Sequence, residues 1–440
     1  MQESRPFLIR GQQPLTGSIE VLGAKNSALA ILAGALAIPG KHFLRDVPRI
    51  VELERFREIF EALGCQWERT STHSLRLEVP EKLALEKLPV ETAKKTRAVL
   101  LLAGALVTRG EKKFRLPFSG GCQLGKRTVA PHLYALEKLG VRVRTGEDFW
   151  EFLAEEGRKG ASVVLSEAGD TTTSNALLAA VSTPGKTTIR FASANYSCQD
   201  LAFFLRERGA RISGIGTTTL EIEGGAPLSA GEYAILNDPI EAFSFLSLAA
   251  TTGSGFEILG VPRQFVELEL ERLDKMGWRP EILRERKSRS GNFALWDLKT
   301  PEGKAELRAL PDKIDERPFP GLNSDNLPVF APIATQARGT TMLHDWMYEN
   351  RAVYLVELQR LGAAVKLLDP HRVEITGPTE LRGAEVVCPA MLRAGMVLLI
   401  AMLAASGDSI LRNTMMLERG YENLPERLRA LGAEIRRKED

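Results

Sequence analysis

A cysteine-containing loop is one segment of this sequence whose residue types could carry out chemistry. Cys122 stands in Ser119-Gly-Gly-Cys-Gln-Leu-Gly-Lys126-Arg127, among three glycines and just before two cations. Nearby cations favour the thiolate, so Cys122 could be a reactive thiol or a proton donor. The glycine-rich loop could also close over a substrate. A free cysteine is more often buried and inert, and that alternative stays open.

A lysine and an asparagine stand directly before an apolar run, in Gly23-Ala-Lys25-Asn26-Ser27. If the run is a helix, the lysine charge, the amides and the helix dipole together make an anion site. The alternative is a solvated lysine next to a serine that caps the helix.

A carboxylate occurs in the turn-rich segment Asn323-Ser324-Asp325-Asn326-Leu327-Pro328. Asp325 could act as a general base if a substrate hydroxyl is presented to it. Capping of the following helix is the more common role for such an aspartate.

Four arginines also stand in segments of interest. The planar guanidinium fork suits phosphate and carboxylate groups, although a single arginine is usually a surface residue. Their spacing in the sequence does not show that they converge. They are Arg97, Arg351, Arg393 and Arg419.

The elements that must position these residues follow a repeat with a period of roughly 70 residues. In one half of the repeat, a helical pattern ends in glycine and a strand pattern follows at once. A helix needs a left-handed residue at this place, which glycine supplies. The six glycines are Gly64, Gly140, Gly209, Gly277, Gly362 and Gly432.

The other half of the repeat is a helix of small residues that runs into a turn and a β-rich stretch. The alanine and glycine content predicts that these helices pack closely at the centre of a domain, with the longer helices outside. The turns contain Gly40, Gly110, Gly185, Gly253, Gly339 and Gly407.

Six such units could form one ring or two groups of three. The length of the chain favours two α/β domains of three units each. A small ligand would then bind in the cleft between the domains. The alternative is a repeat scaffold without a site.

The composition excludes several classes of protein. The net charge of +2 argues against a global footprint for nucleic acid. The apolar runs Ala28–Ala37 and Met396–Ala405 are much shorter than the roughly 20 residues of a membrane span. Because the first ten residues lack a signal core, we expect a cytoplasmic enzyme. The four cysteines and five histidines show no ligand spacing, so we expect no disulfide framework, metal or other cofactor.

Gly23–Asn26, the loop cysteine and Glu418-Arg-Gly-Tyr-Glu422 occur together and in register. This combination resembles the UDP-N-acetylglucosamine enolpyruvyl transferase family, whose members make the first committed precursor of bacterial peptidoglycan. The resemblance covers essentially the whole chain. It implies a two-domain inside-out α/β barrel of six repeated units, three per domain. The implied domains are residues 23–235, which carry the Cys122 loop, and residues 1–22 with 236–440, and the active site lies in the cleft between them.

The resemblance also implies roles for individual residues in an addition followed by an elimination. Asp325 would take the proton of the acceptor hydroxyl as it attacks C2 of phosphoenolpyruvate. Cys122 would protonate C3 and would be the target of the epoxide antibiotic fosfomycin. Lys25, Arg127 and Arg419 would bind phosphoenolpyruvate, and Asn26 would bind the sugar. The other implied substrate-binding residues are Arg97, His132, Met347, Arg351 and Arg393. The implied partners are the small-molecule substrates phosphoenolpyruvate and a nucleotide sugar. No obligate protein partner is implied.

The departures from the family cluster on the acceptor side. Met391 stands where the family has an aspartate, and Thr128-Val-Ala-Pro-His132 replaces the Pro-Val-Asp-Leu-His of the uridine pocket. Ala194-Asn-Tyr-Ser-Cys198 replaces Arg-Glu-Pro-Glu-Ile, which makes Cys198 a structural residue. We interpret Asp238 and Glu241 as structural or hinge residues at the domain crossing.

Three alternatives remain at this point. The acceptor could be a different nucleotide sugar. The shikimate-pathway enolpyruvyl transferase shares the fold, but Lys25-Asn26 and Cys122 argue against it. A non-catalytic binding protein could also retain the fold, and Met391 is the best argument for that alternative.

Overall fold

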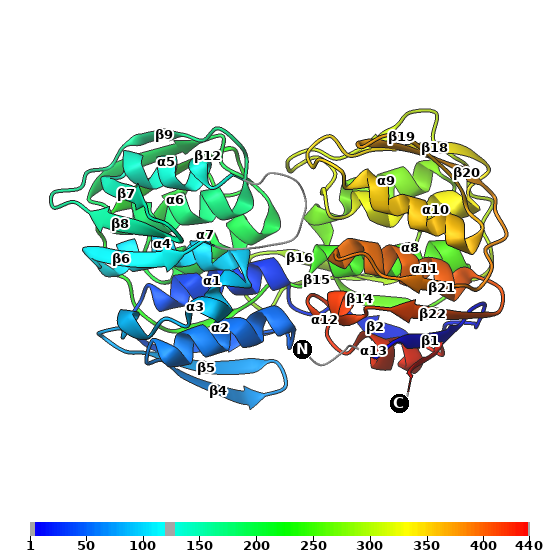
Figure 1. Ribbon diagram of the computed structural model, residues 1–440, viewed down its shortest axis with the longest axis horizontal. Helices are drawn as coiled ribbons and strands as arrows, with labels where there is room; N and C mark the ends of the chain where they lie inside the picture. Colours follow the sequence, from blue (N-terminus) through cyan, green and yellow to red (C-terminus); the bar gives the residue numbers. More distant parts are fainter. Residues whose placement is uncertain (1–4, 119–127, 439–440) are drawn as a thin grey trace. The chain divides into compact units, whose positions relative to one another are not determined.

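The computed structural model describes residues 5–118 and 128–438 (Figure 1). Among these residues the chain divides into two compact units, which we call the middle unit and the terminal unit. The middle unit comprises residues 23–118 and 128–236, and the terminal unit comprises residues 5–22 and 237–438. Each unit has a hydrophobic core of its own. The chain passes from one unit to the other after Leu22 and after Leu236.

The middle unit contains three sheets, with the strand orders β13-β3-β5-β4, β6-β8-β7 and β11-β12-β10-β9. Its elements in chain order are α1 (Lys25–Leu36), β3 (Gly40–Arg45), α2 (Val51–Ala62), β4 (Gln66–Ser71), β5 (Ser74–Val79), η1 (Leu85–Lys87), α3 (Val90–Lys94), η2 (Arg97–Leu100), α4 (Leu101–Arg109), β6 (Lys113–Pro117), α5 (Ala130–Lys138), β7 (Val141–Thr145), β8 (Phe149–Ala154), β9 (Ser162–Val164), α6 (Asp170–Ser182), β10 (Gly185–Arg190), α7 (Tyr196–Glu207), β11 (Arg211–Ser213), β12 (Thr219–Gly224) and β13 (Glu232–Ala234).

The terminal unit also contains three sheets, with the strand orders β15-β16-β14-β2, β17-β18-β20-β19 and β21-β22-β1-β23. Its elements are β1 (Phe7–Arg10), β2 (Ser18–Glu20), α8 (Pro239–Thr252), β14 (Glu257–Pro262), η3 (Arg263–Phe265), α9 (Glu267–Lys275), β15 (Glu281–Lys287), β16 (Ala294–Lys299), β17 (Ile314–Asp315), η4 (Leu327–Val329), α10 (Phe330–Gln336), β18 (Gly339–His344), η5 (Ala352–Leu361), β19 (Ala364–Asp369), β20 (Arg372–Gly377), β21 (Glu385–Val387), α11 (Leu392–Ala404), β22 (Asp408–Arg412), α12 (Met415–Glu418), α13 (Leu424–Ala430) and β23 (Glu434–Arg437).

The predicted repeat is visible in the order of these elements. A buried helix leads to a strand, an amphipathic helix follows, and two further strands complete the sheet, as in α1, β3, α2, β4 and β5. The six glycines that end the second helix of each repeat all have positive φ angles, from 80° at Gly140 to 111° at Gly209. A residue with a Cβ atom is strained in this left-handed conformation, which is why glycine recurs there.

The small-residue helices form the centre of each unit, as the sequence predicts. Nearly every residue of α1, α4 and α6 in the middle unit is buried, and the same holds for α8, α10 and α11 in the terminal unit. Figure 1 shows the sheets at the periphery of each unit. None of the described helices is long and apolar enough to span a bilayer.

The two ends of the described chain meet in one sheet of the terminal unit. Strand β1 lies between β22 and β23 and pairs antiparallel with each of them. Phe7 is opposite Leu411 on one side and opposite Arg437 on the other. The sheet of the sixth repeat is therefore completed by β1, a strand from the beginning of the chain.

Glycine and asparagine set the spacing between two central helices of the middle unit. A Cβ atom at Gly104 of α4 would lie 2.7 Å from the backbone oxygen of Asn175 in α6. The Asn175 side chain accepts a hydrogen bond from Gly104 N and donates one to Leu100 O, at 2.9 and 2.8 Å. Close packing of these helices therefore requires a residue without a side chain at position 104.

We predict that Gly104→Ala destabilises the protein by about 1–3 kcal/mol, because the added methyl group must push α4 away from the backbone of α6. Gly34→Ala in α1 is the matched control. There the Cβ atom would meet only the side chains of Leu201 and Phe204, at 3.0 Å. The gain in helix propensity is the same in both variants, so Gly34→Ala should cost less than about 1 kcal/mol. Denaturant unfolding measures the difference, and equal stability of the two variants would contradict the prediction.

Candidate active site

Lys25 and Asn26 are the first two residues of helix α1. The residue before them, Ala24, has no side chain that could cap the helix. Its backbone N–H donates to Leu236 O at 2.7 Å, and this bond fixes the point at which the chain enters the helix. Lys25 therefore stands at the positive end of the α1 dipole, and its role in binding an anion stays a prediction.

The Asn26 side chain is held by a tyrosine from another helix. Asn26 Nδ2 donates a hydrogen bond to the hydroxyl group of Tyr196, the first residue of α7, at 3.0 Å. Tyr196 is 1 % exposed. This contact joins the first sequence motif to the segment that replaces the family's Arg-Glu-Pro-Glu-Ile.

A polar cluster lies at the N-terminal ends of α6 and α7. The Asp170 carboxylate accepts hydrogen bonds from Ser193 Oγ at 2.6 Å and from Asn195 Nδ2 at 2.8 Å. Asn195 in turn caps α7 by accepting the Tyr196 N–H at 2.9 Å. Cys198 is 2 % exposed and donates to the backbone oxygen of Asp170. These contacts lock the beginning of α7 against α6.

Arg97 stands at the start of η2 and reaches the altered uridine-pocket segment. Its Nη2 atom donates to Thr128 O at 3.1 Å. The Thr128 hydroxyl accepts the N–H of Ala130, the first residue of α5, at 3.1 Å. The Thr128 side chain therefore binds the first backbone N–H of α5. The aspartate of the family segment would stand two residues later, at the position of Ala130.

His132 is buried in the packing of α5 against α6. It is 2 % exposed, its Nδ1 atom lies 2.9 Å from Asn175 Nδ2, and its Nε2 atom lies 3.4 Å from the Thr171 hydroxyl. Burial, with the nearby Arg97 charge, lowers the pKa of His132 to about 4, so the ring is neutral. Both ring nitrogens are engaged within the middle unit, and a substrate contact of His132 stays a prediction.

In the terminal unit, Asp325 lies between two buried arginines. Its Oδ2 atom accepts a hydrogen bond from Arg393 Nη2 at 2.9 Å, and its Oδ1 atom lies 3.4 Å from Arg351 Nη1. Arg351 and Arg393 are 2 % and 8 % exposed. Burial alone would lower the pKa of both arginines, but the neighbouring acidic groups raise it above its ordinary value. Three of the predicted site residues are thus brought together in one charged cluster.

The Glu418–Glu422 motif contributes a tyrosine to this cluster. The Tyr421 hydroxyl accepts a hydrogen bond from Arg393 Nη1 at 2.9 Å and lies 3.1 Å from Ser244 Oγ. Arg419 is the C-cap residue of α12, two positions before Tyr421. The sequence motif pointed to this segment, but it did not show that Tyr421 holds Arg393.

The turn that carries Asp325 is held in place by the buried carboxyl group of Glu269. The Asp325 N–H donates to Asn323 Oδ1 at 2.9 Å, and Asn326 Nδ2 donates to Glu269 Oε1 in α9 at 2.7 Å. Burial raises the pKa of Glu269 to about 7. Glu269 and Asn326 are 2 % and 0 % exposed, so this pair fixes the position of the turn inside the unit.

Two further acidic residues, Asp345 and Glu316, lie next to each other near Arg351. Asp345 forms an ion pair with Arg351 Nε. Glu316 is fully buried, its Oε1 atom accepts the N–H of Met347 at 2.9 Å, and its backbone oxygen accepts the indole N–H of Trp346. Burial and repulsion from the Asp345 carboxylate raise the pKa of Glu316 to about 8. Met347 is therefore tied to the cluster through its backbone, while 36 % of the residue is exposed.

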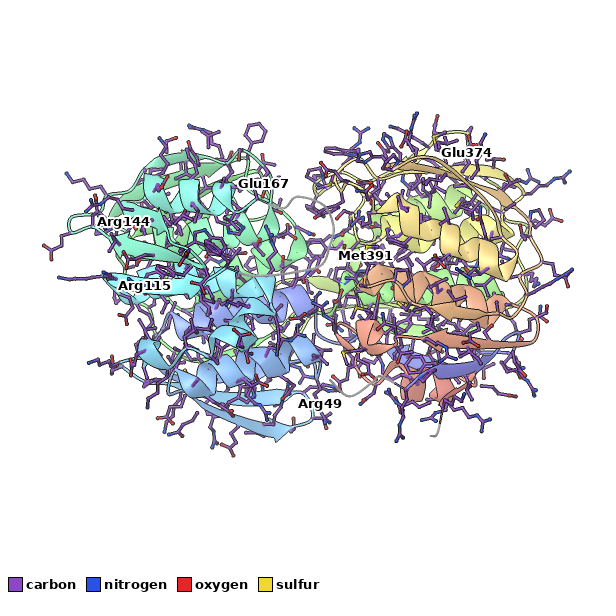
Figure 2. All side chains as sticks on the ribbon, in the orientation of Figure 1. Arg49, Arg115, Arg144, Glu167, Glu374 and Met391 are labelled. Atoms are coloured by element: carbon purple, nitrogen blue, oxygen red, sulfur yellow. The ribbon has the colours of Figure 1, made fainter. Side chains whose placement is uncertain are left out.

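Met391, labelled in Figure 2, is the N-cap residue of α11, two positions before Arg393. Its side chain makes no cap and packs against the core of the terminal unit. The aspartate expected here would have supplied both a cap and a charge. The structure gives the thioether a packing role only.

Asp238 and Glu241 fasten the beginning of α8. Asp238 accepts the N–H groups of Ile240 and Glu241, at 2.8 and 3.4 Å. The Glu241 carboxylate accepts Leu22 N at 2.8 Å and forms an ion pair with Arg427. Both residues act where the chain crosses between the units, which agrees with their interpretation as structural.

Cys122 and Arg127 lie outside the described residues. The other three cysteines are free and buried. Burial raises the pKa of Cys65 and of Cys388 to about 12 and raises that of Cys198 further still. These three thiols are protonated and inaccessible, so they are poor nucleophiles.

Sequence reasoning missed Asp345, Glu316, Tyr196 and Glu269. Asp345 stands two residues before Met347, so its closeness to a predicted residue was a usable signal. Glu316, Tyr196 and Glu269 are distant in the sequence from the residues that they hold, and nothing in their local sequence indicates the contact.

Residues 9–428 match the protein family described as EPSP synthase (3-phosphoshikimate 1-carboxyvinyltransferase). The match spans nearly the whole chain. The chain belongs to this family. It is therefore a carboxyvinyltransferase, and the family resemblance seen in the sequence motifs is confirmed.

Several relatives of this carboxyvinyltransferase carry the more specific name UDP-N-acetylglucosamine 1-carboxyvinyltransferase. The protein from Treponema denticola is 37 % identical over 98 % of this chain and 99 % of its own length. The protein from Bradyrhizobium diazoefficiens is 38 % identical over 98 % of this chain and 97 % of its own length.

Solved structures confirm the predicted fold of the carboxyvinyltransferase. The enolpyruvyl transferase NikO from Streptomyces tendae superposes with a TM-score of 0.85 at 24 % identity, covering 99 % of each chain. An EPSP synthase from Acinetobacter baumannii superposes with a TM-score of 0.75 at 19 % identity, covering 98 % of this chain and 99 % of its own. At these identities the similarity establishes the fold alone.

We predict that Glu316→Gln changes how stability depends on pH. Because the folded pKa of Glu316 lies above its ordinary value of 4.5, the wild type loses stability as the pH rises from about 4.5 to about 8. The glutamine variant is free of this loss. Its free energy of unfolding relative to the wild type should grow by about 2 kcal/mol or more between about pH 5 and about pH 8.

Urea unfolding at each pH measures this difference. Glu302→Gln, which changes an exposed carboxyl group of the same unit, is the control and should follow the wild type. Parallel pH profiles for Glu316→Gln and the wild type would contradict the prediction.

Proposed function

We propose that this carboxyvinyltransferase transfers the carboxyvinyl group of phosphoenolpyruvate to the 3-hydroxyl group of UDP-N-acetylglucosamine and releases phosphate. The observation that carries the proposal is the full-length similarity to proteins named for this acceptor, at 37 % and 38 % identity. The charged cluster around Asp325 supports it, because a base for a hydroxyl group must be held in a fixed position.

In the proposed reaction, Asp325 takes the proton of the 3-hydroxyl group as its oxygen forms a bond to C2 of phosphoenolpyruvate. Cys122 delivers a proton to C3, which gives a tetrahedral intermediate. The bond between C2 and the phosphate oxygen then breaks, C3 loses a proton, and the enolpyruvyl ether and phosphate remain. Cations stabilise the negative charge of the donor through both steps, and we assign this task to Lys25, Arg127 and Arg419.

The other predicted site residues are assigned to the acceptor and to positioning. We propose that Asn26 binds the sugar, that Met347 contacts the nucleotide sugar, and that Arg351 and Arg393 hold Asp325. The contacts of Asp325 with these two arginines support the last assignment. Arg97 and His132 would shape the nucleotide side of the site.

The product of this reaction is a precursor of peptidoglycan, so we propose a role in building the bacterial cell wall. We place the enzyme in the cytoplasm, where both substrates would be available, and we propose that it needs no protein partner.

A different nucleotide sugar is the second candidate acceptor. Ala130 and Met391 replace two aspartates on the acceptor side, and the first removes a hydrogen-bond acceptor for a nucleobase. The donor-side residues Lys25 and Arg419 match the family. Changes confined to one side favour retained phosphoenolpyruvate chemistry, with UDP-N-acetylglucosamine the first candidate acceptor and a modified nucleotide sugar the second.

We predict that the purified protein releases phosphate from phosphoenolpyruvate when UDP-N-acetylglucosamine is present. Asp325→Asn should reduce the rate by about 10²- to 10⁴-fold, because the amide keeps the shape of the side chain but has only one acceptor oxygen for the two arginines and cannot take the proton. Asp312→Asn, an exposed aspartate of the same unit, is the control and should keep the wild-type rate.

Release with only another nucleotide sugar would keep the chemistry and change the acceptor. Release with shikimate 3-phosphate alone would favour the EPSP synthase reaction. No release with any acceptor, or a fully active Asp325→Asn variant, would overturn the proposed function or the role of Asp325 respectively.

We predict that fosfomycin modifies the protein at Cys122 only, and that Cys122→Ser prevents the modification and impairs turnover. The physical reason is the burial of the other three thiols. Intact-protein mass spectrometry, followed by peptide mapping, measures the adduct. An adduct that persists in Cys122→Ser would show that a different residue reacts.

A further inference from the structure

The contact between Asn26 and Tyr196 joins the N-terminal ends of two neighbouring helices. Asn26 is the second residue of α1 and Tyr196 is the first residue of α7. Asn26 Nδ2 donates to the Tyr196 hydroxyl group at 3.0 Å. The family segment that Ala194–Cys198 replaces has proline at the place of Tyr196, and proline has no side-chain acceptor for this bond.

The two helices run side by side in the same direction. A Cβ atom at Gly34, eight residues after Asn26, would lie 3.0 Å from the side chains of Leu201 and Phe204. Phe204 is likewise eight residues after Tyr196. The helices therefore approach closely through a glycine at one level and meet through the Asn26–Tyr196 bond at another.

The position of Tyr196 is fixed independently of Asn26. Its backbone N–H is capped by Asn195 Oδ1 at 2.9 Å, and Asn195 Nδ2 is held by Asp170 Oδ2 at 2.8 Å. The tyrosine side chain is 1 % exposed, so its ring has little freedom to turn. The hydroxyl group is therefore a preorganised partner, and the shorter Asn26 side chain adjusts to it.

This contact restrains the position of the Asn26 amide. One N–H of the amide is engaged by Tyr196, and none of the described residues donates to the carbonyl Oδ1. A tyrosine hydroxyl can both donate and accept, so the bond fixes where the amide lies, and the end of the amide that Tyr196 does not engage is left for a ligand.

We propose that Tyr196 is a positioning residue that holds the Asn26 amide in place, so that the end of the amide that Tyr196 does not engage hydrogen-bonds a hydroxyl or amide group of the acceptor sugar. This inference rests on the proposed function and on the assignment of Asn26 to the acceptor. Tyr196 does not touch the reacting atoms. It acts through Asn26 and contributes to the choice of acceptor, on the side of the site where the sequence departs from the family.

The test compares wild type, Tyr196→Phe, Asn26→Ala and the double variant by phosphate release, with UDP-N-acetylglucosamine varied at saturating phosphoenolpyruvate. Loss of the orienting bond should raise the KM for the sugar about tenfold in Tyr196→Phe. The KM for phosphoenolpyruvate should change less than about twofold, since the donor is held by cations. In the Asn26→Ala background, Tyr196→Phe should have no further effect, because there is no amide left to orient.

A control separates positioning from simple loss of a buried hydroxyl group. Thr183→Val removes a buried hydroxyl just beyond the other end of α6, where it donates to Ala179 O at 2.8 Å and accepts from Arg158 at 2.9 Å. This variant should lower the melting temperature and leave the KM for the sugar unchanged.

An unchanged KM in Tyr196→Phe would overturn the inference, as would an equal effect with and without Asn26. Equal changes in both KM values would overturn it too, because they indicate a general distortion. If the wild type uses another nucleotide sugar, the same variants are compared with that sugar. If the wild type releases no phosphate with any acceptor, both the proposed function and this inference are wrong. If the wild type is active and Tyr196→Phe has an unchanged KM for the sugar, only this inference is wrong.

Discussion

Close packing of small-residue helices at the centre of each unit is the constraint on which the rest of the structure depends. Helices such as α1, α4 and α11 are buried on all sides, so their side chains are apolar or small over almost the whole length. Charged groups then lie near the helix ends, whereas polar groups farther inside, such as Asn175 of α6, are hydrogen-bonded within the core. The predicted site residues that the structure describes follow this pattern, since Asn26 is the second residue of α1, Arg97 precedes α4, Asp325 precedes η4 and Arg393 lies in the first turn of α11. The ends of the core helices thus determine where chemistry can take place.

Charge is concentrated where these helix ends meet buried arginines. Arg393 is shared between the carboxylate of Asp325 and the hydroxyl of Tyr421, and Arg351 is shared between Asp325 and Asp345. Removing one member would leave another charge buried without its partner, which is costly. Asp325 is therefore held firmly, while its side chain stays 31 % exposed. The arrangement favours precise placement of the carboxylate over its freedom of movement.

The fold could be predicted from the sequence because each repeat is marked by residue types that the local backbone and packing require. Glycine must follow each outer helix, and Gly64 and its five counterparts all adopt the left-handed conformation that this position demands. The small-residue helices were likewise recognisable, since only small side chains permit approaches such as that of Gly104 to Asn175. The positions of Asn26 and Asp325 near helix starts were predictable from the residues next to them in the sequence. Contacts such as Glu316 with Met347, or Tyr196 with Asn26, depend on distant segments meeting, and periodicity carries no information about such pairs.

The pairing of β1 with β22 and β23 has a consequence for the synthesis of the protein. The described residues of the middle unit all lie between residues 23 and 236, so this unit can fold as soon as residue 236 has left the ribosome. The terminal unit cannot close its sheet until the last strand has been made, and β1 must wait for partners that lie about 400 residues later in the chain. During that interval β1 is an unpaired apolar strand, which is open to pairing with another chain. The order of synthesis therefore leaves β1 unpaired for longer than any described strand of the middle unit.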